Sequence, residues 1–312
     1  MGMTKRDEVR VFAPATVSNL GPGFDALGLA LREPGDVVTA RSVGGSGVRI
    51  MRIQGDGGKL PREADANTAG IAAAAVLRRA GVEAGIELEL DKGMPIGSGL
   101  GSSAASAVAA AFAVNLLVGA PLRKAQLIEP CLEAESFVAG RHADNVAPAL
   151  LGGLVLVRSV DPVDVVRLPV PEGLTIAVVT PHFELATRRA REVLPAQVPL
   201  SAMVHTAANL ASFVSALYAN DIDLLGRSVQ DQVVTPARAA LIPGCAEVMR
   251  AALATGAIAT SISGAGPSIF ALCHAESSAR RAAQAMSRAF ADAGLASDVH
   301  LSPLDCPGVR RL

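Results

Sequence analysis

The residues best suited to chemistry lie in Pro95–Ser106, where a glycine-rich stretch runs into serines and an alanine-rich segment. Its glycines occupy alternate positions: Gly97, Gly99 and Gly101. Glycine permits positive φ and a close approach of the backbone to a ligand. Ser102 and Ser103 are good N-cap residues, and the run from Ala104 favours a helix. A helix N-terminus presents free N–H groups and a positive dipole end, so the pattern indicates an anion site or, alternatively, a flexible linker before a core helix.

Two familiar phosphate motifs are excluded by the spacing. No lysine follows the last glycine, so the G-x-x-x-x-G-K-[ST] loop is absent. Ser102 stands where the dinucleotide fingerprint needs its third glycine. A strand with clean alternation at Gly85–Leu90 precedes the loop, and a helix over about Ser102–Val118 follows it. Strand, glycine loop and helix form the context that a phosphate site requires.

Composition excludes several classes of protein. The 312 residues are 50% hydrophobic and 18% charged, which supports a sizeable core. A net charge of −1 without a basic run predicts no nucleic-acid partner. The apolar helix after the loop would be roughly 25 Å long, shorter than the ~30 Å hydrocarbon core, so we expect a buried helix and no membrane partner. Four scattered cysteines and a charged Met1–Glu8 without an apolar core predict reduced thiols, no signal peptide and a cytoplasmic location.

Strands and helices mix without strict alternation, which favours an α+β fold. In the first half we expect strands at Val9–Phe12, Val37–Ser42, Val48–Ile53, Gly85–Leu90 and Gly153–Val157, and helical segments at Asn67–Ala80, Ser102–Val118 and Leu122–Ala139. Gly44–Gly47 should turn the second strand back onto the third. Pro130 should break or kink the last helical segment. The stretch Pro169–Gly173 is the best domain boundary and predicts domains at 1–170 and 171–312.

In the second half we expect strands at Leu174–Thr180 and Asp298–Leu301, a glycine turn at Thr260–Ser268 between two apolar strands, and helices at Glu184–Val193, Ser201–Ala219, Ile222–Val229, Cys245–Ala254 and Ser277–Ala293. Most of these segments are short. No internal repeat or low-complexity tract interrupts them.

Three stretches, in this order along the chain, resemble the motifs of the GHMP kinases: Ala13–Asp25, Pro95–Ala105 and Ser263–Ser268. The resemblance spans nearly the whole chain. It implies a two-domain α+β fold, with a ribosomal-protein-S5-like N-terminal domain and a ferredoxin-like C-terminal domain. ATP and Mg²⁺ would lie between them, and the second stretch would be the phosphate loop.

The resemblance also implies roles for individual residues. The nucleotide would contact Pro95, Gly97, Ser98, Gly99, Leu100, Gly101, Ser102, Ser103, Gly264 and Gly266. Asn67 would lie near the base or sugar, although a residue at a helix start can equally be a cap. Mg²⁺ would be held by Glu135 and Ser103, or by Ser102 in place of Ser103, because a hard cation prefers a few oxygen ligands.

Within the family, the sequence around Thr16–Asp25, His142–Pro148, Thr187–Arg191 and Arg238 is most similar to that of the kinases acting on L-homoserine. This zwitterion needs cations for its carboxylate, an anion for its ammonium and a polar group for its hydroxyl. Those roles would fall to Arg191 and Arg238, to Asp25, and to Asn19. The other substrate contacts implied are His142, Asp144, Asn145 and Thr187.

Several alternatives remain open on the sequence. Asp25 could instead cap a helix beginning near Ala26. The substrate could be another small alcohol, such as mevalonate or shikimate, and a non-catalytic sensor of the same fold is also possible. Asn145 cannot act as a base, and a hydrogen-bonded structural role is favoured for His142 over proton transfer, so we expect catalysis without a dedicated base. The family and the apolar second half of the chain suggest a homodimer.

Overall fold

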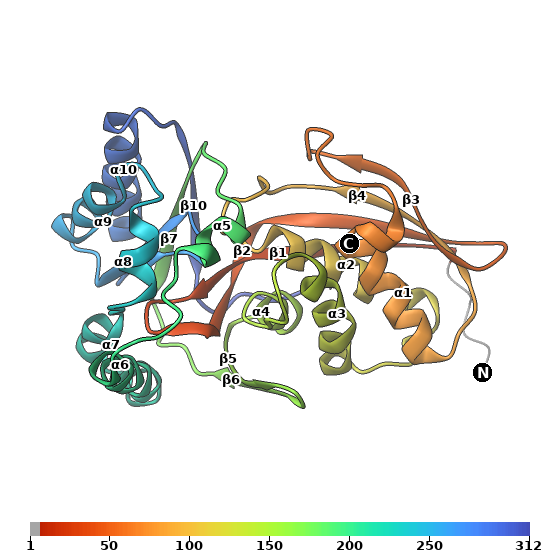
Figure 1. Ribbon diagram of the computed structural model, residues 1–312, viewed down its shortest axis with the longest axis horizontal. Helices are drawn as coiled ribbons and strands as arrows, with labels where there is room; N and C mark the ends of the chain where they lie inside the picture. The colour runs from red at the N-terminus through yellow and green to blue at the C-terminus, as the bar shows by residue number, and fades with distance from the viewer. Residues whose placement is uncertain (1–6) are drawn as a thin grey trace.

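The computed structural model describes residues 7–312 and contains two sheets with helices packed on both (Figure 1). The first sheet has the order β11-β1-β2-β4-β3, and β5 with β6 branches from β2. Its strands are β1 Glu8–Asn19, β2 Gly23–Val43, β3 Gly47–Gln54, β4 Gly85–Asp91, β5 Leu154–Val160, β6 Val163–Leu168 and β11 Arg310–Arg311. The second sheet has the order β10-β7-β9-β8. Its strands are β7 Thr175–Pro181, β8 Ala259–Ile262, β9 Ile269–Cys273 and β10 Ser297–Pro303. The expected α+β class is confirmed.

The expected hairpin between β2 and β3 is wrong. β4 lies between them, antiparallel to β2 and parallel to β3. Gly44 to Gly47 do form a turn, but β3, which follows the turn, pairs with β4 and not with β2. β3 and β4 are parallel, and the helical segment Thr68–Ala80 between them provides the crossover that a parallel pair requires, while Ile86, Leu88 and Leu90 of β4 are buried.

The helices of the first half are α1 Thr68–Ala80, α2 Ser102–Leu117, α3 Ile128–Val138 and α4 Val146–Leu151, with short 3₁₀ turns at Ala64–Ala66 and Lys124–Leu127. α2 packs against β1 and β2 on one side and α1 and α3 on the other, which confirms that it is buried. Its many alanines permit this close packing on several sides. The helix places the phosphate loop at its buried N-terminal end.

The helical segment expected to be broken by Pro130 is in two pieces, but the break falls before the proline. Pro130 is the third residue of α3, within the first turn, where a backbone N–H would have no intrahelical acceptor. α4 was not expected, and neither was α8 at Val234–Ala239. Both are six residues long and carry a proline as their third residue, too short for a periodic pattern to reveal.

The remaining helices are α5 Thr187–Glu192, shorter than expected, and α6 Leu200–Ala219, α7 Ile222–Ser228, α9 Cys245–Ala254 and α10 Glu276–Asp292. α9 and α10 flank the second sheet at one end of the molecule (Figure 1). The four cysteines are buried and free, which confirms reduced thiols. The sequence predicts that Met1–Glu8 is not a signal peptide. Most of that segment, Met1–Arg6, lies outside the described residues.

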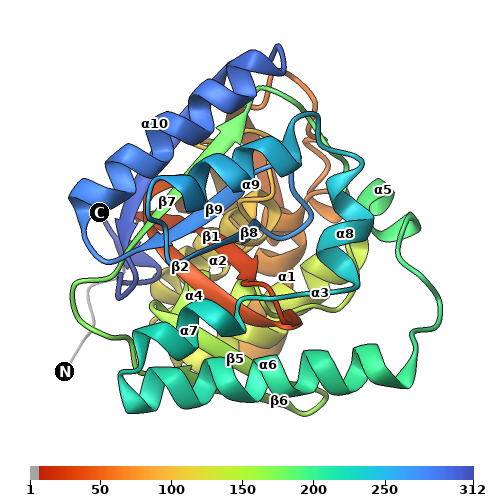
Figure 2. The same cartoon turned by 90° about the vertical axis from the view of Figure 1, so that its left-hand side faces the viewer.

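α6 lies along one edge of the molecule (Figure 2). It has no Asp, Glu, Lys or Arg among its 20 residues, and across residues 7–312 it alone is long and apolar enough to span a membrane. Only 17% of its most apolar window is buried. Phe213 and Leu217 pack into the core, whereas Leu200, Val204 and Tyr218 are exposed.

Candidate active site

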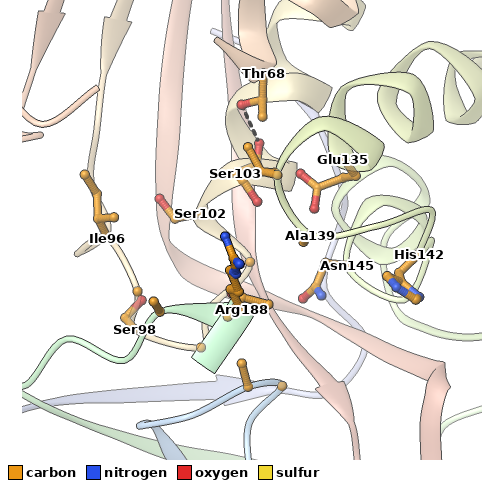
Figure 3. Close-up of a pocket in the computed structure, with 18 of the residues that line it drawn as sticks. Thr68, Ile96, Ser98, Ser102, Ser103, Glu135, Ala139, His142, Asn145 and Arg188 are labelled. Carbon is orange, nitrogen blue, oxygen red and sulfur yellow. Dashed lines mark hydrogen bonds between the residues drawn. The ribbon is translucent and has the colours of Figure 1, made fainter. Parts of the chain in front are cut away.

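A cavity of about 400 Å³ lies where elements of the two sheets meet (Figure 3). Most of the site residues predicted from the sequence line this cavity: Asn19, Asp25, Asn67, Gly97, Ser98, Gly99, Gly101, Ser102, Ser103, Glu135, His142, Asp144, Asn145, Thr187, Arg191, Arg238 and Gly264. Pro95, Leu100 and Gly266 do not line it. The Leu100 side chain is fully buried, and a Cβ added at Gly266 would meet the Ile242 side chain, so these two residues support the cavity wall from behind, whereas Pro95 is exposed.

The glycine-rich loop takes the left-handed backbone that its sequence predicts. The φ values of Gly97, Gly99 and Gly101 are +66°, +79° and +68°. Gly101 itself is the N-cap of α2, so the expectation that the serines cap this helix is wrong. The buried hydroxyls of Ser102 and Ser98 have no hydrogen-bond partner among the residues that the structure describes. Both are left available for a ligand.

The turn between β8 and β9 clamps the loop. The Ser268 hydroxyl donates to the carbonyl of Ser98 at 2.6 Å, and the Ser263 hydroxyl donates to the carbonyl of Gly99 at 2.7 Å. A Cβ added at Gly99 would lie 2.5 Å from the Ser263 carbonyl oxygen. Loop and turn are therefore one unit, in which each backbone fixes the other.

Lys92, at the end of β4, is a site residue that sequence reasoning missed. Its side chain is 2% exposed and pairs with that of Asp36, which is equally buried. The Lys92 ammonium also donates to the Ser102 carbonyl at 2.9 Å and to the Ser106 hydroxyl at 2.7 Å. These contacts use its three donors and hold the first turn of α2. The available signal was its place as the last charge before thirty uncharged positions.

Glu135 of α3 faces Ser103 across the cavity (Figure 3). Burial, helped by the charge of Asp144, raises the pKa of Glu135 to about 7, while a hydrogen bond from Ser103 opposes that rise. One carboxylate oxygen of Glu135 is buried without a partner. Within residues 7–312 no group of three or more Asp, Glu, His or Cys side chains could hold a metal. One orphaned carboxylate beside hydroxyls fits a hard cation that takes most of its ligands from phosphates and water.

Asp25 contacts two basic side chains, those of Arg191 and His142. Arg191 forms a two-pronged contact with its carboxylate at 2.8 and 3.2 Å, and the His142 Nδ1 lies 3.2 Å from it. Burial lowers the pKa of His142, against the opposing effect of Asp25. Asp25 lies in β2 and no helix begins near Ala26, so the alternative of a helix cap is wrong.

Arg238 of α8 is almost completely buried. It donates to the Gly264 carbonyl at 2.7 Å and to the Ala190 carbonyl at 3.1 Å. Burial and the nearby Arg191 lower its pKa to about 10. Both guanidinium groups lie within 6 Å of the Phe24 ring centre, so two cations from different helices converge on one wall of the cavity.

Asparagine side chains fix the surrounding backbone. Asn19 donates to the Gly264 carbonyl at 3.0 Å and accepts from the Asp25 N–H at 3.1 Å. Asn145 accepts from the Thr16 hydroxyl and donates to that of Ser18. Next to it, burial and the charge of Asp25 raise the pKa of Asp144 to about 6.

Asn67 caps α1 by accepting from the Ala69 N–H at 3.0 Å, and it donates to the Pro61 carbonyl at 2.8 Å. The capping alternative is therefore confirmed. Because Asn67 and Pro61 both line the cavity, the cap also shapes the wall there. Its contact with a nucleotide stays a prediction.

A loop that exposes backbone N–H groups and unpaired hydroxyls, facing a buried carboxylate across a cleft, defines a phosphotransferase. The chain belongs to the GHMP kinases: the family's N-terminal domain matches residues 67–153 and its C-terminal domain residues 213–292. It is 44% identical to homoserine kinase of Chlorobium phaeovibrioides, over 97% of this chain and 99% of that one. It is also 44% identical to homoserine kinase of Arabidopsis thaliana, over 97% and 84% of the two chains. The crystal structure of homoserine kinase from Cytophaga hutchinsonii superposes with a TM-score of 0.97 at 47% identity, covering 100% of this chain and 99% of that one.

Proposed function

We propose that this protein transfers the terminal phosphoryl group of ATP to the hydroxyl of L-homoserine, giving O-phospho-L-homoserine for threonine biosynthesis. The observation that carries the proposal is the charge arrangement in the cavity. Asp25 pairs with Arg191 and lies beside His142, in a cavity that the phosphate loop also lines. The homoserine kinase relatives, which match nearly the whole chain, support the same reading.

The zwitterionic substrate would replace part of the contact that charged side chains of the cavity now make with one another. Its carboxylate would lie against Arg191 and Arg238, and its ammonium would take part of the contact that Arg191 now makes with Asp25. Asn19, held by the turn at Gly264, would orient the hydroxyl. In this arrangement every charge of the substrate meets an opposite charge that is already fixed by the protein.

Glu135 with Ser103 would hold Mg²⁺, which when bound supplies positive charge to the phosphate oxygens. The backbone of Gly97 to Gly101 would wrap the phosphates, and the hydroxyls of Ser98 and Ser102 would donate to them. In the transfer, the substrate oxygen bonds to the γ-phosphorus as the bond to the bridging oxygen breaks and ADP leaves. The hydroxyl proton passes to the transferred group or to water. Positioning and charge neutralisation supply most of the acceleration, so no dedicated base is required.

Two alternatives are less well supported. A kinase for mevalonate or shikimate would have no ammonium for Asp25 to bind. A sensor without turnover would have little use for a buried, unpaired carboxylate at Glu135. The family includes other specificities, and the fold alone does not separate them.

A coupled assay of ADP release with purified protein tests the proposal. L-homoserine should be turned over in preference to mevalonate, shikimate and galactose when MgATP is supplied. Equal or better turnover of any of the other three would overturn the substrate assignment, and no turnover of any alcohol would favour the sensor.

We also infer that the enzyme works in the cytoplasm as a homodimer joined through α6. Exposed residues at Leu200, Val204, Ala207, Ala211 and Tyr218 follow one stripe of the helix at spacings of three, four or seven. The stripe is bulky at both ends and small in the middle. An antiparallel partner helix from a second copy, related by a two-fold axis, would meet small residues with small and pair the bulky ends.

A further inference from the structure

Among the described residues, the basic side chains that line the cavity are Lys92, His142, Arg188, Arg191 and Arg238. A nucleoside triphosphate brings several negative charges, and those on the terminal phosphoryl group must be neutralised as it transfers. It therefore matters which of these cations has its charge and donors available. Four of them already contact buried or partly buried groups of the protein.

The three donors of the Lys92 ammonium contact Asp36, Ser102 and Ser106. Arg238 donates to two backbone carbonyls and is closed in by protein. These two cations are part of the scaffold of the site. Moving either would break the contacts that hold the phosphate loop or the turn beside it.

Arg191 and His142 face Asp25. Under the proposed function they belong to the amino-acid end of the cavity, where carboxylate and ammonium are bound. If either residue moved to the phosphate loop, Asp25 would lose one of its two partners.

Arg188, the second residue of α5, is different. Figure 3 shows its side chain reaching from α5 toward the middle of the cavity, into the space bordered by Ser102, Glu135 and Asn145. Within residues 7–312 its one polar contact is with Glu192, four residues on, at 3.2 Å, and its side chain is 89% exposed. An exposed pair of this kind is worth only about 0.3–0.5 kcal/mol, so it exchanges readily for a stronger partner.

We propose that Arg188 binds the terminal phosphoryl group of the nucleotide and stabilises its charge during transfer. The inference rests on the proposed kinase function. The planar guanidinium matches two phosphate oxygens, and it would approach them from α5, whose Arg188 lines the same cavity as the Gly97–Gly101 loop. Arg188 then acts as a catalytic residue supplied by the second half of the chain.

Arg188→Ala, Arg188→Lys and the control Arg189→Ala test this inference. Arg189 lies on the same helix, is exposed and does not line the cavity. ATP and ADP affinities are measured by calorimetry with Mg²⁺ and without an acceptor, which keeps the binding test independent of homoserine. Arg188→Ala should weaken ATP by about tenfold or more while ADP changes less than about twofold, because only ATP carries the group in question. Arg188→Lys should recover part of the loss, since it keeps the charge and loses the fork.

Single-turnover rates with homoserine complete the test. Arg188→Ala should slow transfer by about 10²-fold, less than the 10³–10⁵-fold effect of the arginine fingers of GTPases, because the Arg188 side chain is exposed. If Arg188→Ala matches Arg189→Ala in both ATP affinity and rate, or if ADP weakens as much as ATP, the inference is overturned. If the wild-type protein fails to phosphorylate homoserine but its preference for ATP over ADP still depends on Arg188, the proposed acceptor falls and the phosphate contact stands.

Discussion

Asp25 adopts a backbone that a strand residue seldom takes. Its φ is +55°, and Asn19 and Leu20, on the other side of the same turn, also have positive φ. Left-handed backbone costs a residue other than glycine roughly 1–2 kcal/mol. Contacts with Arg191, His142 and the Asn19 side chain offset the cost. Strain of this kind gathers where a protein holds side chains for a ligand, and here it falls on the two residues assigned to the ammonium and the hydroxyl.

At the carboxylate end, Arg191→Ala should weaken homoserine binding by about 1.5–3 kcal/mol, the worth of a charged hydrogen bond. Arg238→Ala should do the same, with an added loss of stability because Arg238 also holds the Gly264 carbonyl. Calorimetry should find ATP affinity near normal in the Arg191 variant and both affinities unchanged in Arg250→Ala, an exposed arginine of α9. Weakened ATP with unaffected homoserine would reverse the assigned roles.

Asp144 gives a second prediction at this scale. Its pKa is raised to about 6, so between roughly pH 4 and 6 the folded state holds a proton that the unfolded chain releases. Stability from this group therefore falls as pH rises, by about 3 kcal/mol at most. Asp25 and Glu135 oppose ionisation of Asp144, and Arg191 favours it. Asp144→Asn should flatten the pH dependence of urea unfolding over this window and raise stability at pH 7. Identical slopes in the two proteins would contradict the account.

Among the elements, the phosphate loop and the β8–β9 turn depend on one another. Both were visible in the sequence as glycine-rich turns between apolar segments, because glycine marks backbone that other residues avoid. Their contact through Ser263 and Ser268 was not visible, because it joins residues over 160 positions apart. The bounds of the long helices α1, α2, α6 and α10 were predicted closely. The insertion of β4 between β2 and β3 was missed, since alternation identifies a strand and not its neighbour.

Gly99→Val or Gly101→Val should abolish ATP binding while the far-ultraviolet circular dichroism stays native. At Gly101 a Cβ would lie 2.1 Å from the Thr16 hydroxyl oxygen, so a branched side chain must displace the backbone that meets the phosphates. Gly45→Val is the matched control, because its φ is also positive but open space surrounds it. Native nucleotide affinity in a folded Gly99 or Gly101 variant would restore the interpretation of this stretch as a plain linker.

At the scale of the molecule, the active site belongs to neither sheet alone. The switch from one sheet to the other falls between β6 and β7, close to the boundary expected at Pro169–Gly173. One hydrophobic cluster nevertheless joins residues of the first sheet to Phe213 of α6 and Phe270 of β9. The division at residue 170 stays a prediction. Sequence reasoning could not foresee this shared core, because apolar patterns mark buried faces without naming what covers them.

The inferred dimer makes the prediction for this scale. Val204→Glu and Ala211→Glu should convert a dimer to a monomer in sedimentation analysis, since each buries a charge at the centre or flank of the paired stripe. Ala291→Glu, on an exposed position of α10, should leave the dimer intact. A wild-type protein that is monomeric at high micromolar concentration would exclude the pairing, and binding of that monomer to lipid vesicles would instead assign the α6 stripe to a membrane surface.

The strand β11 has a consequence for how the protein is made. It covers the outer edge of β1, with the Val309 N–H bonded to the Ala149 carbonyl and the Leu312 N–H bonded to the Arg10 carbonyl. These residues follow the whole second sheet in the sequence. During translation, the β1 edge of the first sheet therefore stays open to solvent while the second sheet is synthesised. An uncovered strand edge is a template for pairing with another chain. Until β11 has been translated, nascent copies on one messenger can therefore pair with one another through β1. A chaperone that prevents this pairing would bind at β1.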